Sequence, residues 1–379
     1  MRMPSQKGKS KAPHANKEKI KKIMIWVGIV LLAVVAVLAG AVWMATFHPK
    51  AFQKETVVCG RAAPVLKPGQ PVRILCWNVQ YMAGKNYVFY YDLLDGSGPD
   101  ERPSPEDIAL TLKETARVIR DENPDIVMLQ EVDDGAKRTD YEDQLACLLA
   151  LLPEDYSCHA SAFYWKAAFV PHGRIMGAVG MKLSVISKYK ISEAARRQLA
   201  LIPKDPVTKQ FNLKRAVLET RLPIEGTGRA FAVMTTHLDA FAQGTDTMER
   251  QVGQVKGILD GLSKEGNPWV IGGDFNLLAS ANSYHRLPQE ERAYFNPRSE
   301  IGPLLDAYES VPALGDIEGP EYGKWFTHFP NGPRSEGPDR TIDYIFLSEG
   351  IQITEKHVRQ SDTLTISDHL PIVMSVTIP

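Results

Sequence analysis

The segment Val270-Ile271-Gly272-Gly273-Asp274-Phe275-Asn276 carries the pattern that decides the fold. A short apolar run ends in two glycines, and an acid and an amide follow directly. Such a run between turn residues is typical of a buried strand, and the polar residues behind it mark the strand's end. Side chains at strand ends project from a rigid scaffold, where proteins commonly build open sites.

The same arrangement recurs at five other places in the chain. The polar residues at these places are Asn78, Glu131, His237 with Asp239, Asp343, and the pair Asp368-His369 just before an apolar run. A single Asp, Asn or His in such a position is more often a turn, a cap or a structural residue than a functional one. The set as a whole predicts that acids, amides and imidazoles meet at one rim of the fold.

Between these runs the chain alternates strand patterns with helical patterns. Ser104 offers an N-cap and Pro105 a first helical residue for a helix to about residue 120, and a second helix is expected at 247–262. Strands are expected at 72–77, 125–130, 179–187, 215–221, 230–236, 269–272, 341–347 and 372–378. Many strands and fewer helices predict one α/β sandwich, with stacked sheets inside and helices outside, over residues 71–379.

The charge of the chain is unevenly distributed. The 379 residues have a formal net charge of −1, but residues 1–22 hold eight Lys or Arg and one acid, which gives +7 there and −8 for the rest. Binding to phosphate backbones needs positive charge, so an acidic domain argues against a non-specific nucleic-acid binder. Hydrophobic residues make up 44% of the chain, and this composition excludes a disordered protein.

Residues 23–47 form an uninterrupted run of 25 uncharged residues, which is long enough for a helix that crosses a membrane. Trp26 and Trp43 lie near its two ends, where indole rings favour the membrane interface. Residues 1–22 are then a cytoplasmic tail, and the positive-inside rule places the C-terminal domain outside the cytoplasm. A signal peptide cleaved near Ala39-Gly40-Ala41 is the main alternative, although its apolar core would be unusually long. A soluble helix buried on all sides is a further alternative.

Residues 48–70 are rich in proline and lack strong periodicity, so we expect a short linker there. The four cysteines show no metal-binding spacing. An exported domain could pair them, but buried free thiols fit the pattern at least as well. These cysteines are Cys59, Cys76, Cys147 and Cys158.

Two aromatic-rich stretches, at 81–91 and 163–169, interrupt the pattern of strands and helices. Two roles fit them: local packing within loops, or substrate walls and loops that dip into a membrane. The cations Lys166, His172, Arg174 and Lys182 near the second stretch either form a basic groove or are scattered solvated charges.

Taken in order, the strand-end motifs resemble those of the endonuclease/exonuclease/phosphatase superfamily. Its members include pancreatic deoxyribonuclease, abasic-site endonucleases, inositol-phosphate phosphatases and neutral sphingomyelinases. The resemblance spans roughly residues 72–377 and implies a four-layer α/β/β/α sandwich with the site at one rim of the packed sheets. It rests on Trp77-Asn78-Val79, Leu129-Gln130-Glu131-Val132, Thr236-His237-Leu238, Gly273-Asp274-Phe275-Asn276, Ile342-Asp343-Tyr344-Ile345 and Ser367-Asp368-His369-Leu370-Pro371.

The resemblance also implies a divalent metal, usually Mg²⁺ or Mn²⁺. Glu131 would be the principal ligand, with Asn78 beside it on the metal or on a phosphate oxygen. Asp368 or Asp343 would complete the surroundings, depending on the number of metals. Carboxylate and amide oxygens suit such ions, and the absence of clustered Cys and paired His argues against structural zinc.

Phosphoester hydrolysis requires that an attacking water lose a proton near neutral pH. His369 can take this proton because imidazole titrates in that range, and either the adjacent Asp368 or the nearby Asp343 can orient its ring. The resemblance favours Asp343 as the partner of His369, and it assigns Asp274 to the alignment of the water.

Negative charge that grows on the phosphoryl oxygens needs hydrogen-bond donors. Asn276 and His237 are the expected donors. Asp239 fits a turn or cap, although an acid two residues beyond His237 could also reach the site. Arg250 and Gln251 are expected to hold the intervening loop through polar contacts.

These residues predict a membrane-anchored, divalent-metal-dependent phosphoesterase that hydrolyses a phosphodiester by in-line attack of a water activated by His369. The anchor and the acidic domain favour a lipid or another exported phosphoester, and Thr236-His237-Leu238-Asp239-Ala240 is similar to the corresponding segment of neutral sphingomyelinases. Two alternatives stay open: an extracytoplasmic nuclease of the same superfamily, and a non-catalytic, membrane-tethered interaction protein.

Overall fold

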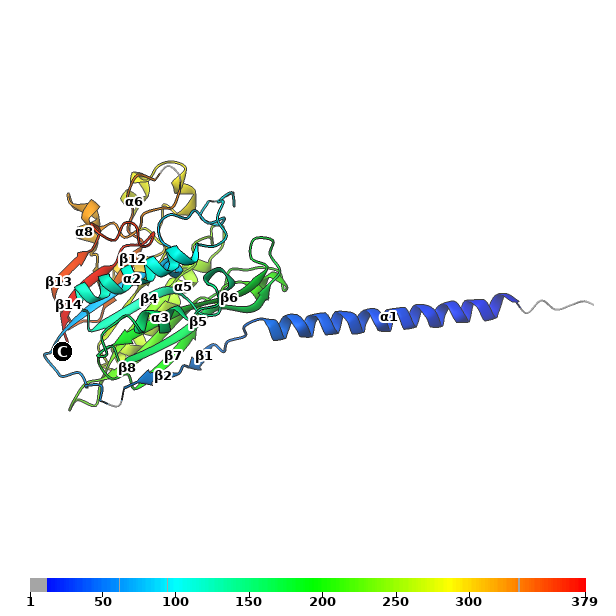
Figure 1. Cartoon of the computed structure of the whole chain (residues 1–379), viewed down its shortest axis with the longest axis horizontal. Helices are drawn as coiled ribbons and strands as arrows, with labels where there is room; N and C mark the ends of the chain where they lie inside the picture. Colours follow the sequence, from blue (N-terminus) through cyan, green and yellow to red (C-terminus); the bar gives the residue numbers. More distant parts are fainter. Residues whose placement is uncertain (1–11, 61, 94, 333–334) are drawn as a thin grey trace, which may run out of the picture.

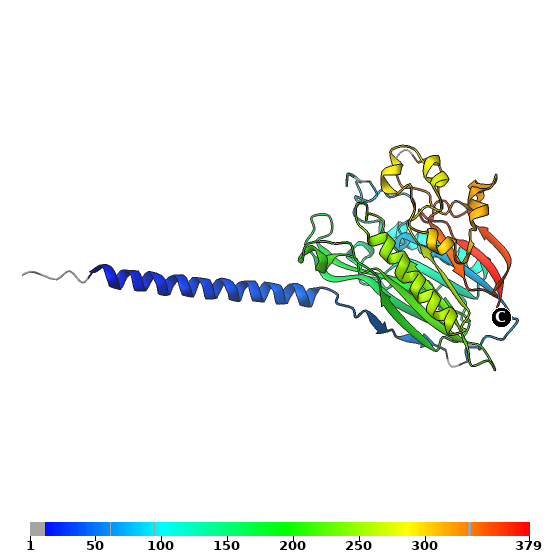
Figure 2. The same ribbon diagram turned by 180° about the vertical axis from the view of Figure 1, so that it is seen from behind.

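The computed structural model describes residues 12–60, 62–93, 95–332 and 335–379. Strands in these residues form two seven-stranded sheets that pack face to face (Figure 1). Helices cover the outer face of each sheet, and Figure 2 shows the same layers from behind. The expected α/β/β/α sandwich is confirmed.

The first sheet has the strand order β13-β14-β3-β4-β6-β5-β2. Its members are β13 (Gln352–Val358), β14 (Ile372–Thr377), β3 (Pro71–Asn78), β4 (Ile126–Asp133), β6 (Gly177–Ser187), β5 (Cys158–Val170) and β2 (Val57–Cys59). The central strands β3 and β4 are parallel, with Asn78 opposite Gln130, so both end at the same rim.

Helix α2 (Pro105–Glu122) and helix α3 (Gln144–Leu149) contribute to the apolar cluster on the outer face of the first sheet. The start of α2 follows the predicted cap, because the Ser104 side chain accepts a hydrogen bond from the backbone N–H of Asp107. Asn123 ends the helix in a left-handed conformation (φ 47°), a geometry that asparagine tolerates well.

The second sheet has the order β1-β7-β8-β9-β10-β12-β11. Its members are β1 (Phe52–Lys54), β7 (Glu193–Gln198), β8 (Ala216–Pro223), β9 (Ala230–His237), β10 (Trp269–Asp274), β12 (Asp343–Leu347) and β11 (Glu309–Val311). Strands β9 and β10 are parallel, with His237 opposite Asp274, and α5 (Thr247–Lys264) and α7 (Gly302–Leu305) cover the outer face.

The largest apolar cluster lies between the two sheets and takes side chains from both. Ile74 and Met128 from the first sheet and Val233 and Val270 from the second are fully buried in it. Close packing here fixes the two sheets relative to each other, so that the rims of β3, β4, β9 and β10 are positioned rigidly. Short helices in the connections include α4 (Thr208–Phe211), α6 (Ala281–Arg286) and α8 (Leu314–Glu318).

The long helix α1 (Ala12–Ala45) precedes the sandwich and extends away from it (Figures 1 and 2). Its part Lys17–Ala45 is long and apolar enough to cross a membrane, a test that a signal sequence also passes. The helix ends at Ala45, two residues before the expected end of the span. Residues 1–11 of the predicted basic tail lie outside the described residues.

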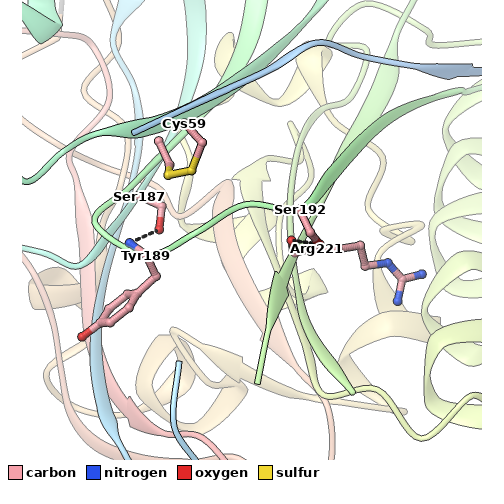
Figure 3. The surroundings of a disulfide bond; sticks show 6 residues. Cys59, Ser187, Tyr189, Ser192 and Arg221 are labelled. Atoms are coloured by element: carbon pink, nitrogen blue, oxygen red, sulfur yellow. Dashed lines mark hydrogen bonds between the residues drawn. A yellow bond between two sulfur atoms is a disulfide. The ribbon is translucent and has the colours of Figure 1, made fainter. Parts of the chain in front are cut away.

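The segment 48–70, where we expected a linker, instead forms edge strands of both sheets. Strand β1 pairs with β7, and strand β2 pairs with β5. A disulfide between Cys59 and Cys158 joins β2 to β5, whereas Cys76 and Cys147 are free. Figure 3 shows this bond beside Ser187 and Tyr189, where the chain leaves the first sheet, and near Ser192, whose hydroxyl donates to the Arg221 carbonyl in the second (3.0 Å). Both edge strands have only three residues, too few for a periodic pattern.

The predicted strands and helices are present with small shifts of their ends, but three longer strands were not predicted: β5, β7 and β13. Residues 163–169, one of the two aromatic stretches, belong to β5 rather than to a loop. Buried positions alternate along β5, but several of them are alanine, which has little preference for strands. Strands β7 and β13 are largely polar, so hydrophobic periodicity does not mark them.

Candidate active site

All predicted site residues lie at one rim of the sandwich, where the parallel pairs β3/β4 and β9/β10 end. Strand β12 begins there, since Asp343 pairs with Asp274. A cavity of about 410 Å³ opens at this rim. Its lining includes Glu131, His237, Asp274, Asn276, Asp368 and His369, while Asn78 and Asp343 lie buried behind these residues.

His369 and Asp343 form a buried imidazole–carboxylate pair. His369 Nδ1 lies 2.8 Å from Asp343 Oδ2, and because a carboxylate only accepts, Nδ1 carries the proton. The opposite nitrogen, Nε2, lies 3.5 Å from Asp274 Oδ2 and faces the cavity. Burial opposes a charge on this ring, but Asp343 and Asp274 outweigh it and raise the pKa of His369 well above its ordinary value.

The Asp274 carboxylate contacts several of the other site residues. Its Oδ2 atom accepts from Asn78 Nδ2 at 3.1 Å and lies 3.2 Å from His237 Nε2. Burial raises the pKa of Asp274 to about 7, partly offset by His369. Burial and the positive charge of nearby Arg215 lower the pKa of His237 well below its ordinary value, so that His237 is neutral.

Glu131 is held beside this group by Asn78. Asn78 Nδ2 donates to Glu131 Oε1 at 3.1 Å, and the Asn78 amide oxygen accepts from the backbone N–H of Gln80 at 3.0 Å. With its oxygen occupied and its side chain buried, Asn78 is placed to orient Glu131 and Asp274 rather than to face the cavity. Glu131 has a positive φ of 57°, an uncommon backbone conformation outside glycine.

Asp368 also lines the cavity, but the hydrogen-bond partner of His369 Nδ1 is Asp343 and not Asp368. Its Oδ2 accepts from Asn331 Nδ2 at 3.1 Å, and the same amide group lies 3.1 Å from Asp92 Oδ2. Lys85 Nζ donates to Asn331 Oδ1 at 2.7 Å. Burial, followed by the charge of Asp368, raises the pKa of Glu131 above its ordinary value.

The donor set at this rim fits a hard divalent cation. Glu131, Asp274 and Asp368 are carboxylates that burial and like charges destabilise as anions, and a cation relieves both effects. Carboxylate oxygens and water are the ligands that Mg²⁺ and Mn²⁺ prefer. Ligand atoms of His328, Asp368 and His369, and those of Asp274, Asp343 and His369, also lie within 4.8 Å of one another.

Asn276 lies at the cavity in a left-handed conformation (φ 53°), directly after β10. Its backbone N–H donates to Asp274 Oδ1 at 2.9 Å, and its side-chain Nδ2 donates to the Leu238 carbonyl at 3.2 Å. These bonds fix the side chain at the edge of the site with one amide hydrogen left for a substrate oxygen.

The Asp239 side chain is held in place by an ion pair and a hydrogen bond. Arg215 Nε lies 3.0 Å from its Oδ1, and Gln251 Nε2 donates to its Oδ2 at 2.7 Å. Gln251 thus holds the loop after β9, as expected. Arg250 instead pairs with Asp246 at the exposed start of α5, at 3.8 Å.

Three residues that contact the site were not among the predicted site residues: Asp92 and His328 line the cavity, and Tyr164 lies buried behind it. Tyr164 Oη lies 3.3 Å from His237 Nδ1, His328 stacks edge-on against His369 with ring centroids 4.6 Å apart, and Asp92 shares Asn331 with Asp368. Tyr164 belongs to the unpredicted strand β5 and to the aromatic stretch 163–169, for which a substrate wall was one expected role. The other two residues lie on loops, and no local pattern marks them, because only long-range contacts bring them to the rim.

The cavity extends beyond the acidic rim along an apolar wall. The wall is built by side chains from β5 and from the connections after β7 and β9, namely Trp165, Leu201, Ile202, Phe211, Leu213 and Phe241. A cavity of about 410 Å³ is within the usual range for small-molecule sites. The site therefore has room for an organic substituent on a phosphate.

The cations near residues 166–182 do not form a basic groove. Lys182 is buried and pairs with Asp134 at 2.9 Å and Asp143 at 3.0 Å, and Arg174 lies 3.3 Å from Glu101. With these two charges neutralised, the structure gives no support to nucleic-acid binding at this place.

Comparisons with known proteins agree with this architecture. The sequence model described as the endonuclease/exonuclease/phosphatase family matches residues 75–369. A solved endonuclease/exonuclease/phosphatase from Beutenbergia cavernae is 22% identical, with 82% of this chain and 72% of that chain covered at a TM-score of 0.56. No curated protein matches the sequence.

Two more distant structures have lower TM-scores. The human Nocturnin catalytic domain with a bound sulfate anion is 17% identical, with 86% of this chain and 98% of that chain covered at a TM-score of 0.48. A mannosyl-6-phosphatase from Bacteroides thetaiotaomicron is 15% identical, with 80% and 99% covered at a TM-score of 0.44.

Proposed function

The chain belongs to the endonuclease/exonuclease/phosphatase family, whose members are metal-dependent phosphoester hydrolases, and we propose that it hydrolyses a phosphodiester at the outer face of a membrane. The observation that carries this proposal is the His369–Asp343 pair, whose free nitrogen faces the same cavity as Glu131 and Asp368. Because they face the same cavity, the general base and the metal ligands can act on one bound phosphate.

In the proposed reaction, His369 Nε2 takes a proton from the attacking water, and Asp343 stabilises the imidazolium that forms. Asp274, 3.5 Å from Nε2, aligns this water through its carboxylate. Asn276 donates a hydrogen bond to a phosphoryl oxygen, where negative charge grows. Neutral His237 has one N–H, and with Nε2 3.2 Å from Asp274 Oδ2 this N–H holds the Asp274 carboxylate in place. No covalent intermediate with the enzyme is required.

Glu131 and Asp368, which line the same cavity, would hold the divalent cation, with Asn78 orienting Glu131. When bound, Mg²⁺ or Mn²⁺ supplies positive charge to the phosphate oxygens or the leaving oxygen. In this proposal the Asn78 amide acts by donating to Glu131 Oε1.

Three observations support an exported, lipid-like substrate. The helix Lys17–Ala45 has the length and composition of a membrane anchor, and the basic residues before it favour, by the positive-inside rule, a sandwich outside the cytoplasm. The Cys59–Cys158 disulfide suits an oxidising compartment. The apolar wall of the cavity suits a substituent less polar than a nucleotide. The likeness to neutral sphingomyelinases rests only on residues 236–240.

The function is tested with the full chain in detergent or vesicles. Release of product from bis(p-nitrophenyl) phosphate, sphingomyelin, phosphatidylcholine and plasmid DNA is measured with Mg²⁺ or Mn²⁺ and with EDTA. We expect metal-dependent hydrolysis of the soluble diester and of a lipid, and loss of both in Glu131→Ala and His369→Ala. Cleavage of DNA without lipid hydrolysis would establish the nuclease alternative, and no hydrolysis of any substrate would reject the proposal.

A further inference from the structure

Helix α1 joins the sandwich directly at the strand that walls the cavity. The helix ends at Ala45, and the next residue, Thr46, pairs with Ala167 of β5. Phe47 follows, with its ring centroid 6.4 Å from that of Phe163 in the same strand. Since no free linker separates the helix from β5, this strand lies within a few residues of the point where a membrane-spanning α1 would emerge.

Three large apolar side chains are exposed close to this junction. Phe169 is 43% exposed, Met176 52% and Val207 64%, and we call these three residues the apolar tip. Phe169 and Met176 lie on the β5–β6 hairpin, where the pairing of Val170 with Gly177 places them at the same end. In Figures 1 and 2 this hairpin extends on the side from which α1 leaves.

Val207 belongs to the same surface because α4, which it precedes, packs on the hairpin. Phe211 of α4 contacts the buried cluster of Ala167, Val170 and Val179. Two exposed lysines lie on the same elements, Lys166 on β5 and Lys209 on α4, together with the exposed acid Asp205 before Val207. Exposed apolar side chains with lysines on the same elements suit the interfacial layer of a phospholipid bilayer.

The elements that carry the apolar tip also build the apolar wall of the cavity. Trp165 comes from β5, Phe211 from α4, and Leu213 from the residues just after α4. The cavity therefore opens beside the tip rather than on the opposite side of the sandwich. A volume of about 410 Å³ accommodates a phosphate and a headgroup but not two acyl chains as well.

From this continuity we propose that the apolar tip inserts into the bilayer that α1 crosses, and that the cavity takes the phosphodiester of a lipid whose acyl chains stay in that bilayer. The inference rests on the proposed function and narrows its substrate to membrane phospholipids. Attachment to the same surface keeps the site at a high effective concentration of its substrate. Soluble diesters gain nothing from this arrangement.

Insertion is tested without reference to catalysis. The full chain carrying Cys147→Ser and Met176→Cys is labelled with an environment-sensitive fluorophore and reconstituted into phosphatidylcholine vesicles that contain spin-labelled lipids. Leu110, which is 59% exposed on α2, gives the matched position Leu110→Cys. We expect quenching and a blue shift at position 176 and neither at position 110. A label at 176 that behaves like the label at 110 would overturn the inference.

The effect on the substrate is tested with Phe169→Ser/Met176→Ser in the otherwise unchanged full chain. Hydrolysis of vesicle sphingomyelin or phosphatidylcholine is expected to fall at least about tenfold, while hydrolysis of bis(p-nitrophenyl) phosphate changes less than about twofold. The control Leu110→Ser/Leu314→Ser removes two exposed leucines elsewhere and is expected to leave both rates unchanged.

Equal loss on both substrates would contradict the inference and indicate a damaged fold. If the unaltered chain hydrolyses neither substrate, the proposed function fails, and the fluorescence experiment alone then decides whether the tip meets the membrane. Hydrolysis of the soluble diester without any lipid hydrolysis would keep the proposed reaction and reject the lipid.

Discussion

Tyr164 determines which nitrogen of His237 carries a proton. Its hydroxyl lies 3.3 Å from Nδ1, whereas Nε2 lies 3.2 Å from the Asp274 carboxylate. A neutral ring with Nε2–H toward Asp274 needs a donor at Nδ1, and the phenol supplies one. Tyr164 is thus a positioning residue that acts through His237.

Removal of this hydroxyl tests the role. Tyr164→Phe is expected to lower kcat by roughly tenfold to a hundredfold with little change in KM, because His237 loses its fixed orientation. Tyr156→Phe removes another buried hydroxyl, which donates to the Pro124 carbonyl at 2.8 Å on the other side of the molecule. Steady-state kinetics of both variants on the soluble diester distinguish the positioning role of Tyr164 from a general loss of stability. An equal loss of kcat in both variants would contradict the positioning role.

Asp343 sets both the orientation and the basicity of His369. Asp343→Asn is expected to lower kcat by up to about 10⁴-fold, by analogy with the aspartate of serine-protease triads. A base acts when neutral, so the raised pKa of His369 predicts a rate that increases with pH. Loss of Asp343 removes a group that raises this pKa, so the rising limb of the kcat/KM profile moves to lower pH. A limb that stays in place would exclude His369 as the titrating base.

The site residues that the sequence located lie beside an apolar run. Asn78, Glu131, His237 and Asp274 each follow an apolar run, so a local pattern is sufficient to find them. Tyr164, His328 and Asp92 have no such mark, because their place depends on how distant segments pack. The catalytic assignments of all these residues stay predictions until the kinetics above are measured.

At the scale of elements, α2 is fastened to the first sheet through its last residue, Glu122. Arg73 of β3 lies 2.6 Å from the Glu122 carboxylate, Arg359 lies 3.1 Å from it, and His357 of β13 lies 3.5 Å from it. The hydrogen bond from His357, with the help of Arg73, lowers the pKa of Glu122 to about 2 despite burial.

This depressed pKa predicts a pH dependence of stability. The stabilisation is fully present above the ordinary value of 4.5 and is lost as the pH falls toward about 2. Glu122→Gln is expected to lower the free energy of unfolding by about 1–3 kcal/mol at neutral pH and to flatten its decline in acid. Urea unfolding at several pH values measures this, with the exposed Glu349→Gln as control. A variant that keeps the same decline would assign the acid effect elsewhere.

The Cys59–Cys158 disulfide holds a three-residue edge strand that few hydrogen bonds would keep in place. It closes a separation of 99 residues, so its loss enlarges the unfolded ensemble. Cys59→Ser/Cys158→Ser is expected to cost about 2–4 kcal/mol of stability without changing kcat. Thermal unfolding with and without reductant, with Cys147→Ser as control, provides the measurement. An unchanged Tm in the double variant would show that β2 needs no covalent support.

The elements that the sequence missed share one physical cause. Strands that are buried on both faces, such as β3, β4 and β9, appear in the sequence as continuous apolar runs and are easily predicted. Strand β7 instead buries Arg196, whose guanidinium donates to the carbonyls of Phe163 and Lys214. The sequence of β7 is therefore mainly polar, and hydrophobic periodicity does not identify it as a strand. Such strands can be identified only when the strands that pair with them are known.

At the scale of the whole molecule, the proposed cation site joins segments that lie far apart in the sequence. Glu131 lies near the end of β4, and Asp368 lies just before β14 of the same sheet. A cation held between them stabilises the folded sandwich, because the unfolded chain cannot bring these carboxylates together.

Divalent cations are therefore expected to raise the Tm. At a concentration of about 100 times Kd, the gain is roughly 2.7 kcal/mol. Glu131→Ala should remove this gain even where activity cannot be measured, and Glu349→Gln should keep it. Thermal unfolding with Mg²⁺, Mn²⁺ or EDTA is the test, and a Tm that is the same in all three would argue against a cation at Glu131 and Asp368.

The two short strands β1 and β2 have one more consequence, for any release of the domain from its anchor. A protease that cuts between Ala45 and Phe52 would shed an intact sandwich. A cut after Cys59 would not release the domain, because the disulfide to Cys158 would still join it to the fragment that contains α1. The window for releasing a folded domain is thus only a few residues wide, and it begins where the chain leaves the helix.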